Sequence, residues 1–339
     1  MDRKAALKSD SRDVERELSG LVTGVERWRA SIRASYIGHP EIVEQLILCA
    51  IAGGHALIEG VPGLGKTTLV KAFANALELS FARVQFTPDL MPGDVLGGRI
   101  LDEDASGRRS MRFEPGPIFA HVVLADEINR AGPRTQSALL EAMAERQVTS
   151  FGETRALPDP FLLVATENPI EMEGTYPLPE AQLDRFLFQI RVPQPNLAEL
   201  TAVLGEVSRP RTLPTARAAT QQDLQSWRNL VSETLASSEI VEFAARIVLA
   251  TSPRASDSPA IVQRSVRHGS SPRGGLAMLA SAKARALTLG RLHVTREDIT
   301  AVAIPSLRHR LILSYEGQAA DADRDAIVRA ALDSAAAKP

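Results

Sequence analysis

The sequence predicts an α/β protein in which a parallel five-stranded sheet covered by helices is followed by a smaller all-helical domain. Short apolar runs alternate with stretches whose apolar residues recur at helical spacing, a pattern typical of a parallel sheet with helices between its strands. Beyond about residue 195 only helical patterns remain. A chain of 339 residues is long enough for two domains, each with its own core.

Five apolar runs are expected to form the strands of the sheet, and they lie at residues 56–58, 82–86, 122–125, 161–165 and 186–192. In the same part of the chain, helices are expected at residues 22–37, 41–52, 69–77 and 133–145. The stretch 87–117 is rich in Pro and Gly and is expected to be mainly loop. Residues 147–158 are expected to form a hairpin around Phe151-Gly152.

The composition changes at Pro193-Gln194-Pro195, which we expect to be the hinge between the domains. We assign residues 1–20 to a flexible or loosely helical segment, 21–193 to the α/β domain and 194–335 to the helical domain. Helix-start signatures and helical patterns in the second domain lie at Asn196 with Glu199, Thr295 with Asp298, 239–251 and 275–289.

A complete phosphate-binding loop, Gly60-Val61-Pro62-Gly63-Leu64-Gly65-Lys66-Thr67, lies between the first predicted strand and the helix that follows it. Glycines let the backbone turn tightly, so that its N–H groups can surround phosphates, and the helix N-terminus adds a partial positive charge. Lys66 is expected to reach the β- and γ-phosphates, and Thr67 to offer its hydroxyl to Mg²⁺. The sequence therefore predicts that the protein binds a nucleoside triphosphate.

Two acids, Asp126 and Glu127, follow the third apolar run directly. Ligands bind at the carboxyl ends of parallel strands, so both acids are expected to face the nucleotide. Asp126 can hold Mg²⁺, directly or through water, while Glu127 can orient and deprotonate the attacking water. Asn168 follows the fourth run and can position water or touch the γ-phosphate, although Asn168-Pro169 alone is typical of a turn.

The charge, the cysteine content and the apolar runs of the chain bear on its partners and its location in the cell. The formal net charge of −2 gives no support to a general nucleic-acid binder. The only cysteine, Cys49, cannot form an internal disulfide, which fits a reducing cytoplasm. The sequence shows no signal-peptide core and no apolar run long enough for a membrane span. A cytoplasmic protein is expected.

The succession of these motifs resembles the AAA+ ATPases, and the detailed residues resemble the MoxR group within them. The similar stretches lie at residues 58–67, 86–92, 125–131, 165–169, 176–186 and 271–273, and the similarity extends over residues 20–315. The last two stretches contain Arg185 and Arg273, each of which in isolation is more typical of a surface charge.

The resemblance implies a Walker A loop that binds ATP through Gly60, Pro62, Gly63, Leu64, Gly65, Lys66, Thr67 and Thr68. It implies that Asp126 and Thr67 hold Mg²⁺ and that Glu127 is the catalytic member of the Walker B pair. The stretch Tyr36-Ile37-Gly38-His39 falls where the family contacts adenine, with Ile37 and Gly38 as the expected binding residues.

The resemblance also gives roles to three further residues. Asn168 matches sensor 1, which reads the state of the γ-phosphate. Arg185 matches the arginine finger, which reaches the nucleotide of the neighbouring subunit. Arg273 matches the sensor 2 arginine, which the lid carries onto the nucleotide of the same chain. Because Gly274 and Gly275 disfavour a helix interior, the lid helix is expected to start late or to move easily.

The implied assembly is a ring, with a hexamer expected, and in related proteins the segments matching 90–119 and 147–158 face its central pore. The implied function is Mg²⁺-dependent ATP hydrolysis that drives remodelling or maturation of a partner protein, with a von Willebrand factor A domain protein as the expected partner. Two alternatives stay open at this point: a nucleic-acid motor, and a nucleotide-gated binding module with little turnover. The retained Glu127 and Arg185 argue against the second.

Overall fold

The computed structural model describes residues 2–103, 109–168, 175–206 and 218–337. At its centre is a five-stranded sheet in the order β2–β5–β8–β1–β9, in which all paired strands are parallel. The strands are β1 (Ala56–Glu59), β2 (Phe81–Gln85), β5 (Val122–Asp126), β8 (Leu162–Glu167) and β9 (Phe188–Arg191). The expected parallel α/β core is confirmed, and the five predicted strands lie where the apolar runs placed them.

Both faces of the sheet are covered, which explains why its three central strands, β5, β8 and β1, are almost continuously apolar. One face packs against α1 (Asp2–Ser35), α2 (Pro40–Ile51) and α3 (Lys66–Asn75), with large buried side chains such as Trp28 and Phe73. The other face packs against α5 (Pro133–Glu145). The loops at the carboxyl ends of the central strands therefore follow segments that are packed on both faces.

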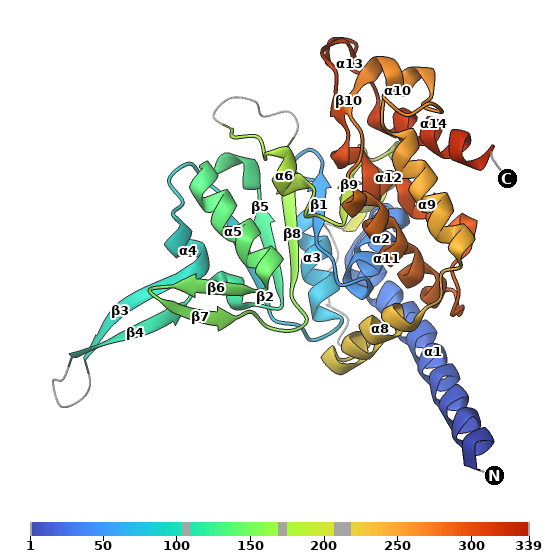
Figure 1. Cartoon of the computed structure of the whole chain (residues 1–339). Helices are drawn as coiled ribbons and strands as arrows, with labels where there is room; N and C mark the ends of the chain where they lie inside the picture. Colours follow the sequence, from blue (N-terminus) through green and yellow to red (C-terminus); the bar gives the residue numbers. More distant parts are fainter. Residues whose placement is uncertain (1, 104–108, 169–174, 207–217, 338–339) are drawn as a thin grey trace.

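The stretch 87–117 is not mainly loop, so that prediction is wrong. It contains α4 (Pro92–Leu96) and an antiparallel hairpin of β3 (Gly97–Glu103) and β4 (Arg109–Pro115), which extends away from the sheet on the side opposite the lid (Figure 1). Most of its side chains are exposed on both faces, so the sequence lacks the apolar alternation that marks a half-buried strand. The second hairpin, β6 (Gln147–Ser150) with β7 (Glu153–Ala156), is present as predicted.

The lid consists mainly of helices, as predicted. They are α7 (Leu197–Glu206), α8 (Gln221–Glu233), α9 (Ser238–Ala250), α10 (Ala260–Ser265), α11 (Pro272–Thr288), α12 (Arg296–Leu307), η3 (Arg308–Arg310), α13 (Tyr315–Ala319) and α14 (Arg324–Ala336). At the first predicted helix start, Asn196 and Glu199 exchange reciprocal hydrogen bonds, and at the second the backbone N–H and hydroxyl of Thr295 donate to Asp298 Oδ2. The lid also holds a short antiparallel pair of β10 (Val266–His268) and β11 (Ile312–Leu313), too short to give a period in the sequence.

The N-terminal helix joins the two domains. Its residue Trp28 lies 4.6 Å from Phe73 of α3 and 6.3 Å from Trp227 of α8, measured between ring centroids. One hydrophobic core therefore continues from the sheet through α1 into the lid. Because α1 begins at Asp2, the chain has no break in secondary structure at residue 20. Among the described residues, no helix is both long enough and apolar enough to cross a membrane.

The lid helix that carries Arg273 does not start late. Helix α11 begins at Pro272 and is capped by Ser271, whose Oγ accepts a hydrogen bond from the Arg273 backbone N–H at 3.2 Å. The two glycines lie inside its first turns and meet different surroundings. A Cβ on Gly274 would lie 2.1 Å from Ser270 Oγ and 2.7 Å from Leu307 Cδ2, whereas a Cβ on Gly275 would lie 3.4 Å from its nearest neighbour, on Val248.

Replacing Gly274 with alanine is expected to destabilise the protein by about 1–3 kcal/mol, because the methyl group forces apart two packed elements of the lid. Replacing Gly275 with alanine is the matched control, expected to be neutral or to stabilise by up to about 1 kcal/mol through helix propensity. Thermal unfolding of both variants measures the difference. Equal shifts in Tm for the two variants would contradict the close packing at Gly274.

Candidate functional site

The predicted phosphate loop connects β1 to α3 at the carboxyl edge of the sheet. Gly63 and Gly65 have φ of 86° and 73°, values that side-chain-bearing residues rarely adopt, so glycine is needed at both turns. The Gly60 N–H donates to Glu167 O at 3.2 Å and fixes the start of the loop to β8. Gly60, Pro62, Lys66 and Thr67 complete the loop and the first turn of α3.

Lys66 is buried against its own loop. Its Nζ donates to the carbonyl oxygen of Gly60 at 2.7 Å. Burial lowers the pKa of the Lys66 ammonium, and the nearby carboxylates of Asp126 and Glu127 oppose that shift. The structure therefore brings the lysine and the two acids into electrostatic contact at one edge of the sheet.

A cavity of about 310 Å³ lies beside this loop. Of the predicted nucleotide-binding residues, it is lined by Ile37, Gly38, Gly63, Leu64, Gly65 and Thr68. Tyr36, from the same predicted stretch, also lines it, whereas sequence reasoning missed Pro193, Pro195 and Leu200 of α7, which complete its wall. This volume and this position beside a phosphate loop are suitable for the base of a nucleotide.

Thr166 fixes the two acids at the end of β5. Its hydroxyl donates to Asp126 Oδ1 at 2.7 Å and accepts from the Glu127 backbone N–H at 2.8 Å. Glu127 has a φ of 56°, in the left-handed region, which costs a non-glycine residue of the order of 1–3 kcal/mol. The buried threonine thus holds a strained turn that aims the Glu127 carboxylate.

Residues of the neighbouring strand β2 hold both carboxylates. Gln85 Nε2 donates to Glu127 Oε2 at 3.0 Å, and Arg83 Nη2 donates to Asp126 Oδ2 at 2.7 Å. Arg130 Nη1 also reaches Glu127 Oε2, at 3.1 Å. Sequence reasoning missed Thr166, Arg83 and Gln85. The signal that finds them is the strand order, which places β2 and β8 on either side of β5.

Asn168 is buried directly after β8, at the same edge as the two acids. The residue before it, Glu167, lies near Glu59, which precedes the phosphate loop. Burial, and then the charge of Glu59, raise the pKa of the Glu167 carboxyl to about 7. Near neutral pH the protonated form of Glu167 is therefore well populated beside the predicted sensor.

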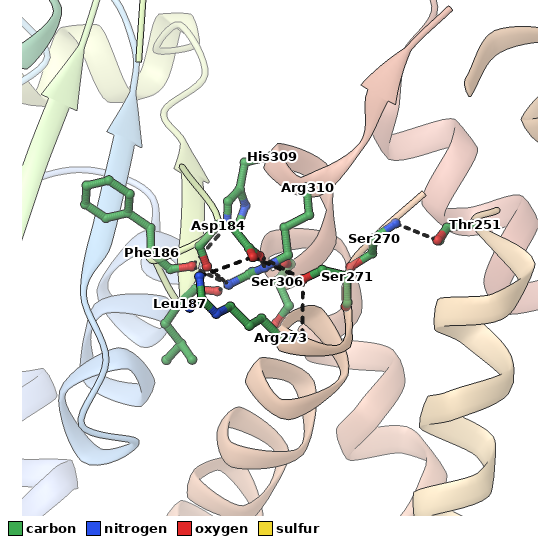
Figure 2. Close-up of polar contacts among 10 residues, drawn as sticks. All are labelled: Asp184, Phe186, Leu187, Thr251, Ser270, Ser271, Arg273, Ser306, His309 and Arg310. Atoms are coloured by element: carbon green, nitrogen blue, oxygen red, sulfur yellow. Dashed lines mark hydrogen bonds and ion pairs between the residues drawn. The ribbon is translucent and has the colours of Figure 1, made fainter. Parts of the chain in front are cut away.

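Arg185 and Arg273 are not among the residues that line the cavity beside the phosphate loop. Arg185 comes just before β9, whose first residue pairs with Ala56 at the start of β1, whereas the phosphate loop follows the opposite end of β1. Arg185 is exposed, and its Nη1 donates to Leu140 O at 2.8 Å. Arg273 Nη1 lies 3.6 Å from Asp184 Oδ2 (Figure 2), and Asp184 is the residue before Arg185 in the sequence. Among the described contacts, neither arginine reaches the phosphate loop of its own chain, and the arginine-finger and sensor 2 roles stay predictions.

Comparison with known proteins identifies the family. The chain is 38% identical over 320 residues to Chaperone MoxR1 of Mycobacterium tuberculosis, an alignment that covers 94% of this chain and 84% of that protein. The chain belongs to the MoxR family of AAA+ ATPases. It is also 42% identical over 296 residues to an uncharacterised Bacillus subtilis protein named YeaC, covering 86% of this chain and 88% of the relative.

Two family profiles match this chain, one in the α/β domain and one in the helical lid. The profile of the ATPase family associated with various cellular activities (AAA) matches residues 55–188, and that of the AAA lid domain matches 258–331. A solved structure from Cytophaga hutchinsonii, classified provisionally as an ATPase, superposes with a TM-score of 0.89 at 34% identity, covering 96% of this chain and 98% of that one. The MoxR fold expected from the sequence is confirmed.

The residues of the phosphate loop and of the Asp126-Glu127 pair are chemically suited to bind ATP together with Mg²⁺. The N-terminus of α3, the left-handed glycines and Lys66 form a cradle for phosphate groups. Asp126 and Thr67 supply oxygen atoms, which Mg²⁺ prefers as ligands. Asp126 accepts hydrogen bonds from Thr166 and Arg83, and its remaining acceptor capacity suits a water molecule bound to the metal.

Proposed function

We propose that this protein is a Mg²⁺-dependent ATPase whose hydrolysis sites form between neighbouring subunits of a ring, with a hexamer expected. One observation carries the proposal: Arg185 comes just before β9, whose first residue pairs with Ala56 at the end of β1 opposite the phosphate loop, and Arg273 pairs with the adjoining Asp184. Among the described residues, the arginines that contact the two acids are Arg83 and Arg130, and neither Arg185 nor Arg273 does so. A neighbouring copy that presents its Arg185 would supply the finger. On this proposal Arg273 also serves the neighbouring site.

The chain's own residues divide the work of hydrolysis. Lys66 and the loop N–H groups bind the phosphates, and Asp126 with Thr67 holds Mg²⁺, which when bound neutralises phosphate charge. Glu127 accepts a proton from the attacking water. Thr166 binds the backbone of Glu127 and Gln85 binds its carboxylate, and these two contacts position the carboxylate for that step. Asn168 orients that water or the γ-phosphate. Arg185 from the neighbour stabilises the charge that develops in the transition state.

We further propose that ATP hydrolysis remodels or matures a partner protein in the cytoplasm, with a von Willebrand factor A domain protein as the expected partner. Support comes from the name of the similar M. tuberculosis chaperone and from exposed apolar side chains on the two hairpins. Ile100, Leu101 and Met111 on the β3–β4 hairpin and Phe151 on the β6–β7 hairpin are exposed. Apolar side chains gathered on an exposed surface are typical of a protein-binding surface.

The turnover rate per subunit is expected to rise with protein concentration and then to level off, because a single chain does not complete its own site. The measurement is phosphate release across a dilution series, with the oligomeric state followed by light scattering. Chelation of Mg²⁺ is expected to stop turnover, and added DNA or RNA is not expected to increase it. Turnover per subunit that stays constant down to a monomeric solution would contradict the shared site.

A further inference from the structure

Arg310 is a buried arginine of the lid that holds the segment carrying Arg185. Its side chain is 3% exposed, and its Nε donates to Asp184 Oδ1 at 2.8 Å. Nη2 donates to the carbonyl oxygens of Asp184 and Phe186 at 2.8 and 2.7 Å. Nη1 donates to the carbonyl oxygen of Leu187 at 3.3 Å and to one carbonyl of α12. All five guanidinium N–H groups are thus engaged, and four of them bind residues that flank Arg185.

The carboxylate of Asp184 joins three lid residues at one point (Figure 2). Besides the Arg310 guanidinium, it accepts a hydrogen bond from Ser271 Oγ, which lies 3.1 and 3.2 Å from its two oxygens. It also forms the 3.6 Å ion pair with Arg273. Ser271 caps α11, so the start of that helix, the arginine it carries and Arg310 are all bound to the residue next to Arg185.

A second lid side chain binds the same segment. His309 Nε2 lies 3.0 Å from the carbonyl oxygen of Phe186, which also accepts from Arg310. Burial and the neighbouring Arg310 lower the pKa of His309 well below its ordinary value, so the ring is neutral and its Nε2–H donates. The backbone on both sides of Arg185 is therefore held by the lid, while the Arg185 side chain itself is exposed.

We propose that Arg310 and Asp184 are positioning residues for the Arg185 finger, so that the lid of one subunit sets the rate of hydrolysis in the neighbouring subunit's site. This inference rests on the shared ATPase site proposed above. The lid binds the carbonyls of Asp184, Phe186 and Leu187 through one rigid planar group, so a displacement of the lid displaces the backbone of Arg185. Arg273 forms an ion pair with the carboxylate of the same Asp184. A displacement of the start of α11 therefore also acts on the residue next to Arg185.

Asp184→Asn tests the inference, because it keeps the shape of the side chain and removes the charge that Arg310, Ser271 and Arg273 share. We expect kcat to fall by up to about 10²-fold, the cost of a small misplacement of a catalytic group, while ATP affinity stays unchanged. Arg310→Lys is the second variant and is expected to act in the same direction, because one ammonium cannot replace the planar guanidinium fork. Phosphate release gives kcat and KM, and a fluorescent nucleotide gives the affinity.

Mixed rings separate positioning from folding. Asp184→Asn chains, which keep Lys66 and Glu127, are mixed with Glu127→Gln chains, which keep a correctly held Arg185. We expect activity per Asp184→Asn chain to rise above that of the variant alone, because each of its sites can now receive an intact finger. A merely structural defect of the Asp184→Asn chain would not be rescued in this way, and absence of rescue at every mixing ratio would overturn the inference.

Asp298→Asn is the matched control. Asp298 is also a buried lid carboxylate held by two arginines, Arg285 and Arg291, but its described partners lie within the lid. We expect Asp298→Asn to lower Tm without the rescue pattern. An unchanged kcat in Asp184→Asn together with an impaired Arg185→Ala would overturn the positioning role alone. An unchanged kcat in Arg185→Ala would overturn the shared site itself, and with it this inference.

Discussion

Replacing Glu127 with glutamine is expected to lower ATP turnover by about 10²–10⁴-fold while ATP binding persists. Glutamine keeps the shape of the side chain and its contacts with Gln85 and Arg130, but it cannot accept a proton from water. The backbone N–H of residue 127 still donates to Thr166, so the turn after β5 is preserved. Phosphate release measures the loss, and titration with a fluorescent ATP analogue measures the affinity. Normal turnover in this variant would remove Glu127 from the role of base.

The control for this experiment is Glu233→Gln, the same chemical change at an exposed position near the end of α8. It is expected to leave kcat and KM as they are. The Glu127→Gln protein also offers a test of the partner, because it should stay in the ATP-bound state. We expect affinity capture with this variant and ATP, but not with ADP, to retain a von Willebrand factor A domain protein. Capture that is the same with both nucleotides would argue against a nucleotide-driven partner cycle.

The parts of the fold that the sequence predicted are those whose signal is local. Buried strands such as 122–125 and 161–165 are apolar throughout, and the phosphate loop is specified by contiguous residues, so both could be located before the structure was known. The β3–β4 hairpin was missed because it is exposed on both faces, and exposed strands carry no apolar period. The early start of α11 was missed because the two glycines suggested a weak helix, whereas Gly274 is required by close packing against Ser270 and Leu307.

The functional residues that sequence reasoning missed act through long-range contacts. Thr166 and Gln85 reach Glu127 only because β8 and β2 are the two neighbours of β5, an order that no local pattern encodes. Arg310 lies more than 120 residues from the segment that it holds, in a stretch with no motif of its own. The hydrophobic core shared by the sheet and the lid joins the lid stretch around Arg310 to β9. Residue type and spacing therefore located the chemistry, while the three-dimensional contacts identified what positions it.

Replacing Arg185 with alanine is expected to lower kcat by about 10³–10⁵-fold, the range typical of an arginine that stabilises a phosphoryl-transfer transition state. The guanidinium is exposed and its one described hydrogen bond goes to the Leu140 carbonyl, so its removal leaves no buried charge and should cost little stability. ATP affinity of the chain's own loop is expected to stay the same, because Arg185 lies at the opposite end of β1. Phosphate release, nucleotide titration and Tm measure the three quantities.

Mixing decides between a finger that acts across the interface and one that acts within the chain. Neither Arg185→Ala nor Glu127→Gln rings should turn over ATP, yet their mixture should, because an Arg185→Ala chain keeps its own Glu127 and receives an intact arginine from its neighbour. Arg273→Ala in the same mixture locates the second arginine. The structure places Arg273 on the Asp184 carboxylate beside Arg185, so we expect the same rescue. If Arg185→Ala is rescued and Arg273→Ala is not, the lid must carry Arg273 back to its own nucleotide, and the ion pair with Asp184 must break during the cycle.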